Sequence, residues 1–208
     1  MKRLLAAVTL MMMWGAAMWA DSPLTSTDFN QAYAEHPMVR LAADIGPGGT
    51  IPVSLLDFLA DKKAPVDVRV AAINSIGWTL EGHDAVDQLG EYLMKRHKVK
   101  TIDKLVKKMD ATTLCVYAYA KAMSNYFEVA DAAGMAQEAV KKNKDHSFTV
   151  AFIAALINSQ ECMHSGDWCM VYHLVADVDH DGSLKLDMKL EAIDIVMEYI
   201  NLYKEYCK

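Results

Sequence analysis

The sequence predicts an all-α protein of stacked helix pairs, arranged as an irregular solenoid or a helical bundle. Three observations support this fold class. Apolar residues recur at spacings of three and four from Ile51 almost to the end of the chain. The strict alternation typical of β-strands never persists for more than a few residues. Short breaks containing Gly, Pro or Asp separate the periodic stretches, as expected between neighbouring helices.

The composition excludes several classes of protein. The chain has 208 residues, of which 53 % are hydrophobic and 23 % are charged, which is typical of a globular protein. Its formal net charge is −6. A protein that binds a phosphate backbone needs cations to replace the condensed counterions, so we expect no nucleic-acid partner.

Residues 1–20 predict a secretory signal peptide. Lys2 and Arg3 precede an apolar run that is too short to span a membrane. We expect cleavage after Ala20, with cleavage after Ala17 as the alternative. The mature chain then has a net charge of −8, no membrane span, and a periplasmic or extracellular location.

The first part of the mature chain, residues 21–50, is interrupted by turn-forming residues and lacks a helical periodicity of apolar residues. We expect an N-terminal extension here, with one short helix over 29–34. A Gly-rich stretch at 46–50 follows no predicted strand, so it indicates a plain loop and not a phosphate-binding turn. Residues 51–208 are expected to form the α-helical repeat domain.

Local signals mark the helices of this domain. Leu55, Leu56 and Leu59 predict a short helix. The next helix is expected to begin at Pro65, because proline is tolerated in a first turn, and to end at Gly82. Later helices are predicted over residues 86–97, 102–109, 112–127, 129–142, 148–157 and 168–175. A final helix from Leu186 carries the apolar stripe Leu186, Leu190, Ile193, Met197 and Ile200.

Residues 55–80 resemble a HEAT repeat, in which an apolar helix, a short turn and a second helix follow one another. The resemblance rests on Pro65, Asp67, Val68, Arg69, Ala71, Ala72, Ile73 and Gly77. It implies helix pairs that stack because no pair buries its own apolar face. It also implies a protein-binding scaffold, and it transfers no catalytic residue.

Residues 177–188 resemble the EF-hand calcium loop. Asp177, Asp179 and Asp181 occupy loop positions 1, 3 and 5, and Gly182 stands at the sharp turn. The backbone carbonyl of Ser183 would be the ligand at position 7.

The loop departs from the pattern at position 12, where Met188 replaces a bidentate Glu, and Asp187 comes one place early. The resemblance therefore implies a weak Ca²⁺ site with the ligands Asp177, Asp179, Asp181, Ser183 and Asp187. The alternative is a solvated turn between two helices. No organic cofactor is expected.

The four cysteines predict two disulfides in an oxidising compartment. Cys162 and Cys169 enclose a short, turn-forming stretch, so we expect them to pair, which leaves Cys115 to pair with Cys207. A zinc site made of Cys162, His164, Cys169 and His173 is an alternative, although this spacing matches no known zinc motif.

The sequence contains no nucleophile elbow, no P-loop and no metalloprotease motif. Stacked helices with an acidic surface predict an exported module that binds a protein, and a basic partner is expected. An inhibitor or immunity-type protein is one concrete form of this hypothesis. The alternative is an exported hydrolase whose active site assembles from loop Asp and His residues.

Overall fold

The structure is a computed structural model, and it describes residues 21–79 and 84–207. The predicted signal peptide lies outside these residues. The described chain is all-α, as expected, with packed helix pairs and no β-strand. Its α-helices are α2 (Pro37–Ile45), α3 (Val53–Leu59), α4 (Val66–Ile76), α5 (Asp84–His97), α6 (Ile102–Lys108), α7 (Ala111–Ser124), α8 (Ala130–Lys142), α9 (Phe148–Ser165), α10 (Trp168–Asp179) and α11 (Leu190–Ile200). Two 3-10 helices, η2 (Phe29–Tyr33) and η3 (Asn201–Tyr206), complete the described part.

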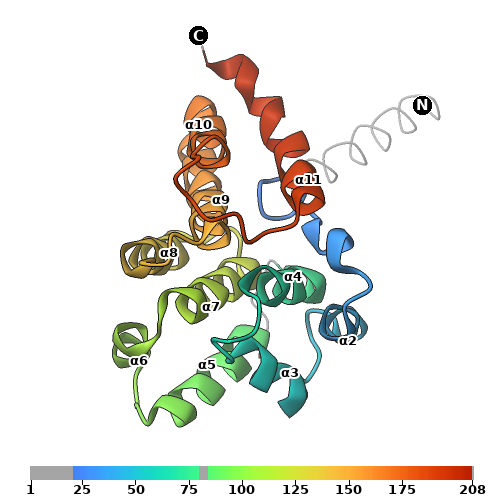
Figure 1. Ribbon diagram of the computed structural model, residues 1–208, viewed down its shortest axis with the longest axis vertical. Coiled ribbons are helices and arrows are strands. Elements are labelled where there is room, and N and C mark those ends of the chain that lie inside the picture. The colour runs from blue at the N-terminus through green and yellow to red at the C-terminus, as the bar shows by residue number, and fades with distance from the viewer. Residues whose placement is uncertain (1–20, 80–83, 208) are drawn as a thin grey trace, which may run out of the picture.

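The N-terminal segment is part of the helical core. The short helix expected at 29–34 is present as η2, and its Phe29 and Tyr33 are buried. The helix α2 was not expected from the sequence. It begins at Pro37, where the side chain of His36 accepts a hydrogen bond from the backbone N–H of Met38. Together η2 and α2 cover one side of α4 (Figure 1).

The helix α4 is shorter than the sequence predicts. It ends at Ile76, because Gly77 takes a positive φ of 93° that breaks the helical path. The expected end at Gly82 is therefore wrong, and residues 80–83 lie outside the described part. The start is close to the expectation, since Pro65 is the N-cap residue.

A fully buried arginine of the HEAT-like stretch, residues 55–80, joins three helices. Arg69 of α4 donates from Nε to the carbonyl oxygen of Leu59 at the end of α3. Its two terminal nitrogens donate to the hydroxyls of Thr112 and Thr113 in the first turn of α7. The guanidinium group thus satisfies one helix end and fixes a second helix start.

The central helices α7 and α9 are buried on nearly all sides, as their two-sided apolar pattern predicts. The helix α7 ends at Ser124, three residues before the expected end. The helix α9 continues to Ser165, eight residues beyond the expected end, and stops at Gly166 with φ 78°. The helix α10 then packs against α9 (Figure 1).

The C-terminal segment returns to the N-terminal segment and closes the molecule. The helix α11 packs against η2 (Figure 1). The backbone N–H of Lys189 donates to the Tyr33 hydroxyl at 3.0 Å, and its Nζ donates to the Ala32 carbonyl at 2.8 Å. The expected apolar stripe is wrong at its start, because Leu186 and Leu190 are 55 % and 65 % exposed. The buried face consists of Ala192, Ile193, Val196, Tyr199 and Ile200.

None of the helices within residues 21–79 and 84–207 combines the length and the apolar character that a membrane crossing requires.

Candidate functional site

Two adjoining cavities form a groove between α5, α6, α7 and α8, the helices at the lower left of Figure 1. Their volumes are 640 and 610 Å³, and both are lined by Asp103, Asp131 and Met135. We call this surface the α5–α8 groove. It is large enough for several side chains of a partner.

The floor of the groove is apolar. Its large side chains are half-buried and pack against the main core: Val86, Met94, Ile102, Val106 and Met135. Two of them are methionines, whose flexible and polarisable side chains adapt to different surfaces. The floor therefore offers apolar area to a partner while staying anchored in the core.

Two glycines shape the groove in different ways. A Cβ atom on Gly134 of α8 would meet no heavy atom within 4 Å, so the groove is open above this residue. A Cβ atom on Gly90 of α5 would lie 3.0 Å from the hydroxyl oxygen of Tyr117. Gly90 thus lets α5 approach the buried tyrosine of α7.

The rim of the groove is acidic. Its carboxylates are Asp87, Glu91, Asp103, Asp131 and Glu138. Within the described residues Asp131 forms an ion pair with Lys121 at 3.7 Å, and Glu138 forms one with Lys141. Asp87, Glu91 and Asp103 are exposed, and in the described part of the chain no lysine or arginine forms an ion pair with them. Burial, together with the charge of Asp87, raises the pKa of Tyr117 in the floor.

The lysine at the far end of the groove serves the fold. Lys142 of α8 donates from Nζ to the carbonyl oxygens of Val106 and Met109 at 2.6 and 2.8 Å. These carbonyls stand at the end of α6 and have no helical partner. The ammonium group therefore attaches α6 to α8. Lys107 and Lys121 also line the two cavities, so five carboxylates of the groove face three lysines.

The predicted calcium ligands do not converge. Asp177 and Asp179 both lie in α10, which continues to Asp179. Two residues apart on a helix, their side chains point about 200° away from each other. Asp177 instead faces His173 one turn earlier, with 3.7 Å between its Oδ1 and the Nδ1 of the imidazole.

The second half of the loop is docked on the start of α9. The Oδ1 atom of Asp187 accepts hydrogen bonds from the backbone N–H and the hydroxyl of Thr149, at 2.8 and 2.9 Å. Asp181 accepts from the backbone N–H and the hydroxyl of Ser183, and these bonds lower the pKa of Asp181. Asp187 therefore satisfies a helix terminus, a role for which the sequence holds no local signal because its partner is 38 residues away.

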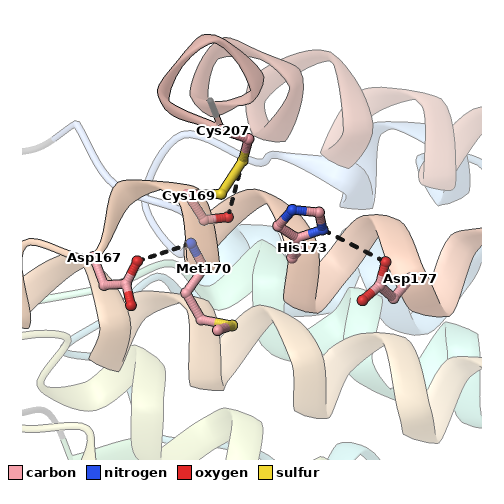
Figure 2. The surroundings of a disulfide bond; sticks show 6 residues. All are labelled: Asp167, Cys169, Met170, His173, Asp177 and Cys207. Carbon is pink, nitrogen blue, oxygen red and sulfur yellow. Dashed lines mark hydrogen bonds and ion pairs between the residues drawn. A yellow bond between two sulfur atoms is a disulfide. The ribbon is translucent and has the colours of Figure 1, made fainter.

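The disulfide pairing differs from the expected one. Cys169 in the first turn of α10 is bonded to Cys207, which follows η3 (Figure 2). The Cys162–Cys169 pair is wrong because α9 stays helical past Cys162, so the tight turn assumed between the two residues does not form. The Cys115–Cys207 pair is wrong because Cys207 is bonded to Cys169, while Cys115 is buried within α7.

The two unpaired cysteines are poor nucleophiles. Complete burial raises the pKa of Cys115 to about 12. Burial, aided by the charges of Asp167 and Glu161, raises the pKa of Cys162. A reactive cysteine requires the opposite shift, toward the thiolate at neutral pH.

The structure separates the four residues of the alternative zinc site. The zinc set proposed from the sequence is not assembled, since Cys162 and His164 lie outside the cluster around Cys169. Within the described residues, the group whose ligand atoms do lie together consists of Cys169, His173 and Cys207, all within 4.8 Å of one another. The sequence missed Cys207 as a neighbour of His173, because only the packing of η3 on α10 brings them together.

The surroundings of the histidines give little support to the hypothesis of an exported hydrolase. His36 accepts a backbone hydrogen bond as the N-cap of α2, and His164 contacts the Gln160 side chain at 3.1 Å. His173 has a carboxylate beside it, as a catalytic triad requires, yet its other neighbours are the sulfur atoms of the disulfide. His83 lies outside the described residues.

Comparison of the chain with protein-family models, with curated proteins and with solved structures finds no match.

Proposed function

We propose that this protein is an exported α-helical module that binds a protein partner through the α5–α8 groove. The observation that carries the proposal is the combination of an apolar floor with an acidic rim. A scaffold of HEAT-like helix pairs would present such a surface between neighbouring pairs.

The chemistry of the groove points to a basic, amphipathic segment as the bound element. An amphipathic helix binds by placing its apolar side chains in a hydrophobic groove. Val86, Ile102 and Met135 would contact those side chains. Lysine or arginine residues on the flanks of the bound helix would face Asp87 and Asp103, and such complementarity speeds association and selects the partner.

The proposed location is the periplasm or the extracellular space. A disulfide between Cys169 and Cys207 suits an oxidising compartment. The leader-like residues 1–20 add sequence support for export. An inhibitor or immunity-type protein, whose acidic groove covers a basic segment of an exported toxin, is one concrete form of this function.

Fluorescence anisotropy with a defined peptide tests the proposal. The probe is a labelled 18-residue amphipathic helix of leucine and lysine, and the matched peptide replaces every lysine with glutamate. We expect saturable binding of the lysine peptide, weakened by salt because the charges of the rim are screened. Binding of the glutamate peptide with equal affinity would overturn the proposal.

Two variants locate the binding site. Gly134→Trp should abolish binding, because the open space above Gly134 lets an indole ring fill the groove without displacing the core. Gly182→Trp is its control, since Gly182 also has open space but lies on the loop after α10. Equal loss of binding in both variants, or retained binding in Gly134→Trp, would contradict the assignment.

A charge series tests the rim separately. Neutralising it by Asp87→Asn, Glu91→Gln and Asp103→Asn together should weaken binding at low salt by at least tenfold and remove most of its salt dependence. The control neutralises three exposed carboxylates elsewhere, by Asp44→Asn, Asp194→Asn and Glu198→Gln. A similar effect of both triple variants would mean that net charge alone governs the binding.

A further inference from the structure

The Cys169–Cys207 disulfide joins the start of α10 to the end of η3. Cys169 lies in the first turn of α10, and the end of η3 places Cys207 over it, with 4.8 Å between the two Cα atoms (Figure 2). Both cysteines are half-exposed, so small ions and reductants reach them. The Sγ atom of Cys207 lies 3.5 Å from the carbonyl oxygen of Cys169.

His173 lies beside the two cysteines and forms a three-residue group with them. His173 follows Cys169 by four residues, so both side chains leave the same face of α10. The ligand atoms of Cys169, His173 and Cys207 all lie within 4.8 Å of one another. Two sulfur atoms and one imidazole nitrogen are a common protein donor set for zinc.

A carboxylate lies beside the imidazole, on the same face of α10. The Nδ1 atom of His173 lies 3.7 Å from Oδ1 of Asp177, one further turn along α10. Figure 2 shows that the other ring nitrogen points to the side of the two sulfur atoms. Histidine ligands of metals almost always donate their second N–H to a carboxylate, a carbonyl or a water, which fixes the tautomer and the ring direction.

We propose that, once the disulfide is reduced, Cys169, His173 and Cys207 form a Zn²⁺ site, with a water molecule as the fourth ligand. Asp177 acts as a positioning residue for His173 and does not bind the metal. The disulfide and the metal ion are then alternative ways to hold η3 on α10. This inference does not depend on the proposed function of the α5–α8 groove.

The chemical balance is simple. A dithiol reductant transfers two electrons and two protons to the Cys169–Cys207 bond and leaves as its own disulfide, which yields two thiols. Each thiol loses its proton on binding Zn²⁺.

The geometry requires only a small movement. Two thiolates on a tetrahedral zinc ion stand about 3.8 Å apart, because each Zn–S bond is about 2.3 Å long. All three ligand atoms already lie within 4.8 Å of one another, so a small shift brings the sulfur atoms to this separation. Cys207 follows the last residue of η3 and has an extended backbone, so a change in its own conformation shifts its sulfur atom without moving α10.

The test uses the full mature chain, reduced with a phosphine under anaerobic conditions and titrated with Co²⁺ as a spectroscopic probe for zinc. We expect one Co²⁺ per chain, with the thiolate charge-transfer and tetrahedral ligand-field bands, and displacement by Zn²⁺. The oxidised protein should show neither band. Absence of these bands from the reduced protein would overturn the proposal.

Single variants assign the ligands, with circular dichroism to confirm the fold. His173→Ala and Cys207→Ser should each weaken Co²⁺ binding by at least a hundredfold. Asp177→Asn should weaken it about 10- to 100-fold while leaving the ligand-field bands in place, as expected of a positioning residue. Cys162→Ser is the control and should bind as the wild type does. Unchanged affinity in His173→Ala, or loss of binding in Cys162→Ser, would contradict the ligand set.

Discussion

Asp110 shows how one side chain joins a helix start to a buried charge. Its carboxylate accepts hydrogen bonds from the backbone N–H of Thr113 and from the hydroxyls of Thr112 and Thr113. Both hydroxyls also accept from Arg69, which is fully buried. Burial alone would raise the pKa of Asp110, but these hydrogen bonds and the charge of Arg69 outweigh it and hold the pKa below its usual value.

This shift predicts a pH dependence of stability. A carboxylate whose pKa is lower in the folded protein than in the unfolded chain stabilises the fold above the unfolded value, about 3.9, and stops doing so as the pH falls through the folded value. Asp110→Asn should therefore lower the free energy of unfolding by about 1 kcal/mol at pH 7, in the range of a lost cap.

The difference between wild type and Asp110→Asn should then shrink as the pH falls below about 4. Urea denaturation at a series of pH values measures it. A difference that stays constant down to pH 2 would show that the charge of Asp110 contributes nothing. Asp145→Asn, at an exposed carboxylate outside any described helix, is the control and should leave the curve unchanged.

Replacing each of the two glycines of the α5–α8 groove with alanine should change the free energy of unfolding in opposite directions. Gly134→Ala should raise the free energy of unfolding by about 0.5–1 kcal/mol, because alanine stabilises a helix interior and the new methyl group meets nothing. Gly90→Ala should lower it by about 1 kcal/mol, because the methyl group is forced against the Tyr117 hydroxyl. Chemical denaturation compares them, and equal stabilisation by both would contradict the packing at Tyr117.

At the scale of the elements, the end of α10 and the start of α9 determine the conformation of the predicted calcium loop. The helix α10 runs through Asp179, and the following loop pairs with the start of α9, where the backbone N–H of Phe148 donates to the Lys185 carbonyl at 2.9 Å. Asp187 is bonded to Thr149 in the same junction. Calcium binding stays a prediction, and it would require Asp177 and Asp179 to leave the helical conformation.

We therefore expect Ca²⁺ to bind weakly, with a Kd in the millimolar range that incomplete loops outside cells display. At ten times Kd the stabilisation is only about 1.4 kcal/mol. The melting temperature should rise accordingly with Ca²⁺, less with Mg²⁺, and not at all in the variant Asp177→Ala plus Asp179→Ala. Calorimetry without any heat of binding up to several millimolar Ca²⁺ would leave the loop as a turn.

At the scale of the whole molecule, contacts between the first and the last segments of the described part, η2 and α11, join them into one core. Lys189 bonds to Tyr33 and to the Ala32 carbonyl, and its Nζ lies 4.9 Å from the centre of the Tyr33 ring. Leu24 also reaches across the molecule, where its N–H donates to the Gln160 side chain. An open solenoid would leave these ends apart.

Lys189→Met tests this closure, because it keeps an apolar stem and removes the ammonium group. We expect a loss of about 1 kcal/mol in the free energy of unfolding, from one hydrogen bond and one cation–π contact. Hydrogen exchange should show faster exchange in both η2 and α11. Lys204→Met, at a looser contact with Tyr172, is the control. Faster exchange in α11 alone would show that the ends are not coupled.

The sequence by itself determined the fold class and most of the helices. The three-and-four spacing of apolar residues is a local property of each helix, and the caps act within one turn. In the structure Asp110 and Ser147 cap α7 and α9 through such contacts within one turn. Two helix ends differ from the predicted ones, since α9 continues to Ser165 and Gly77, not Gly82, ends α4.

Only the tertiary structure decided the cysteine pairing, the partners of the predicted calcium ligands and the α5–α8 groove. Cys169 and Cys207 are 38 residues apart, as are Thr149 and Asp187. Whether such residues meet depends on how helices pack, and no local propensity encodes that distance. The groove arises in the same way, because residues of α5, α6, α7 and α8 that each read as an ordinary amphipathic face share one surface only after those helices have packed.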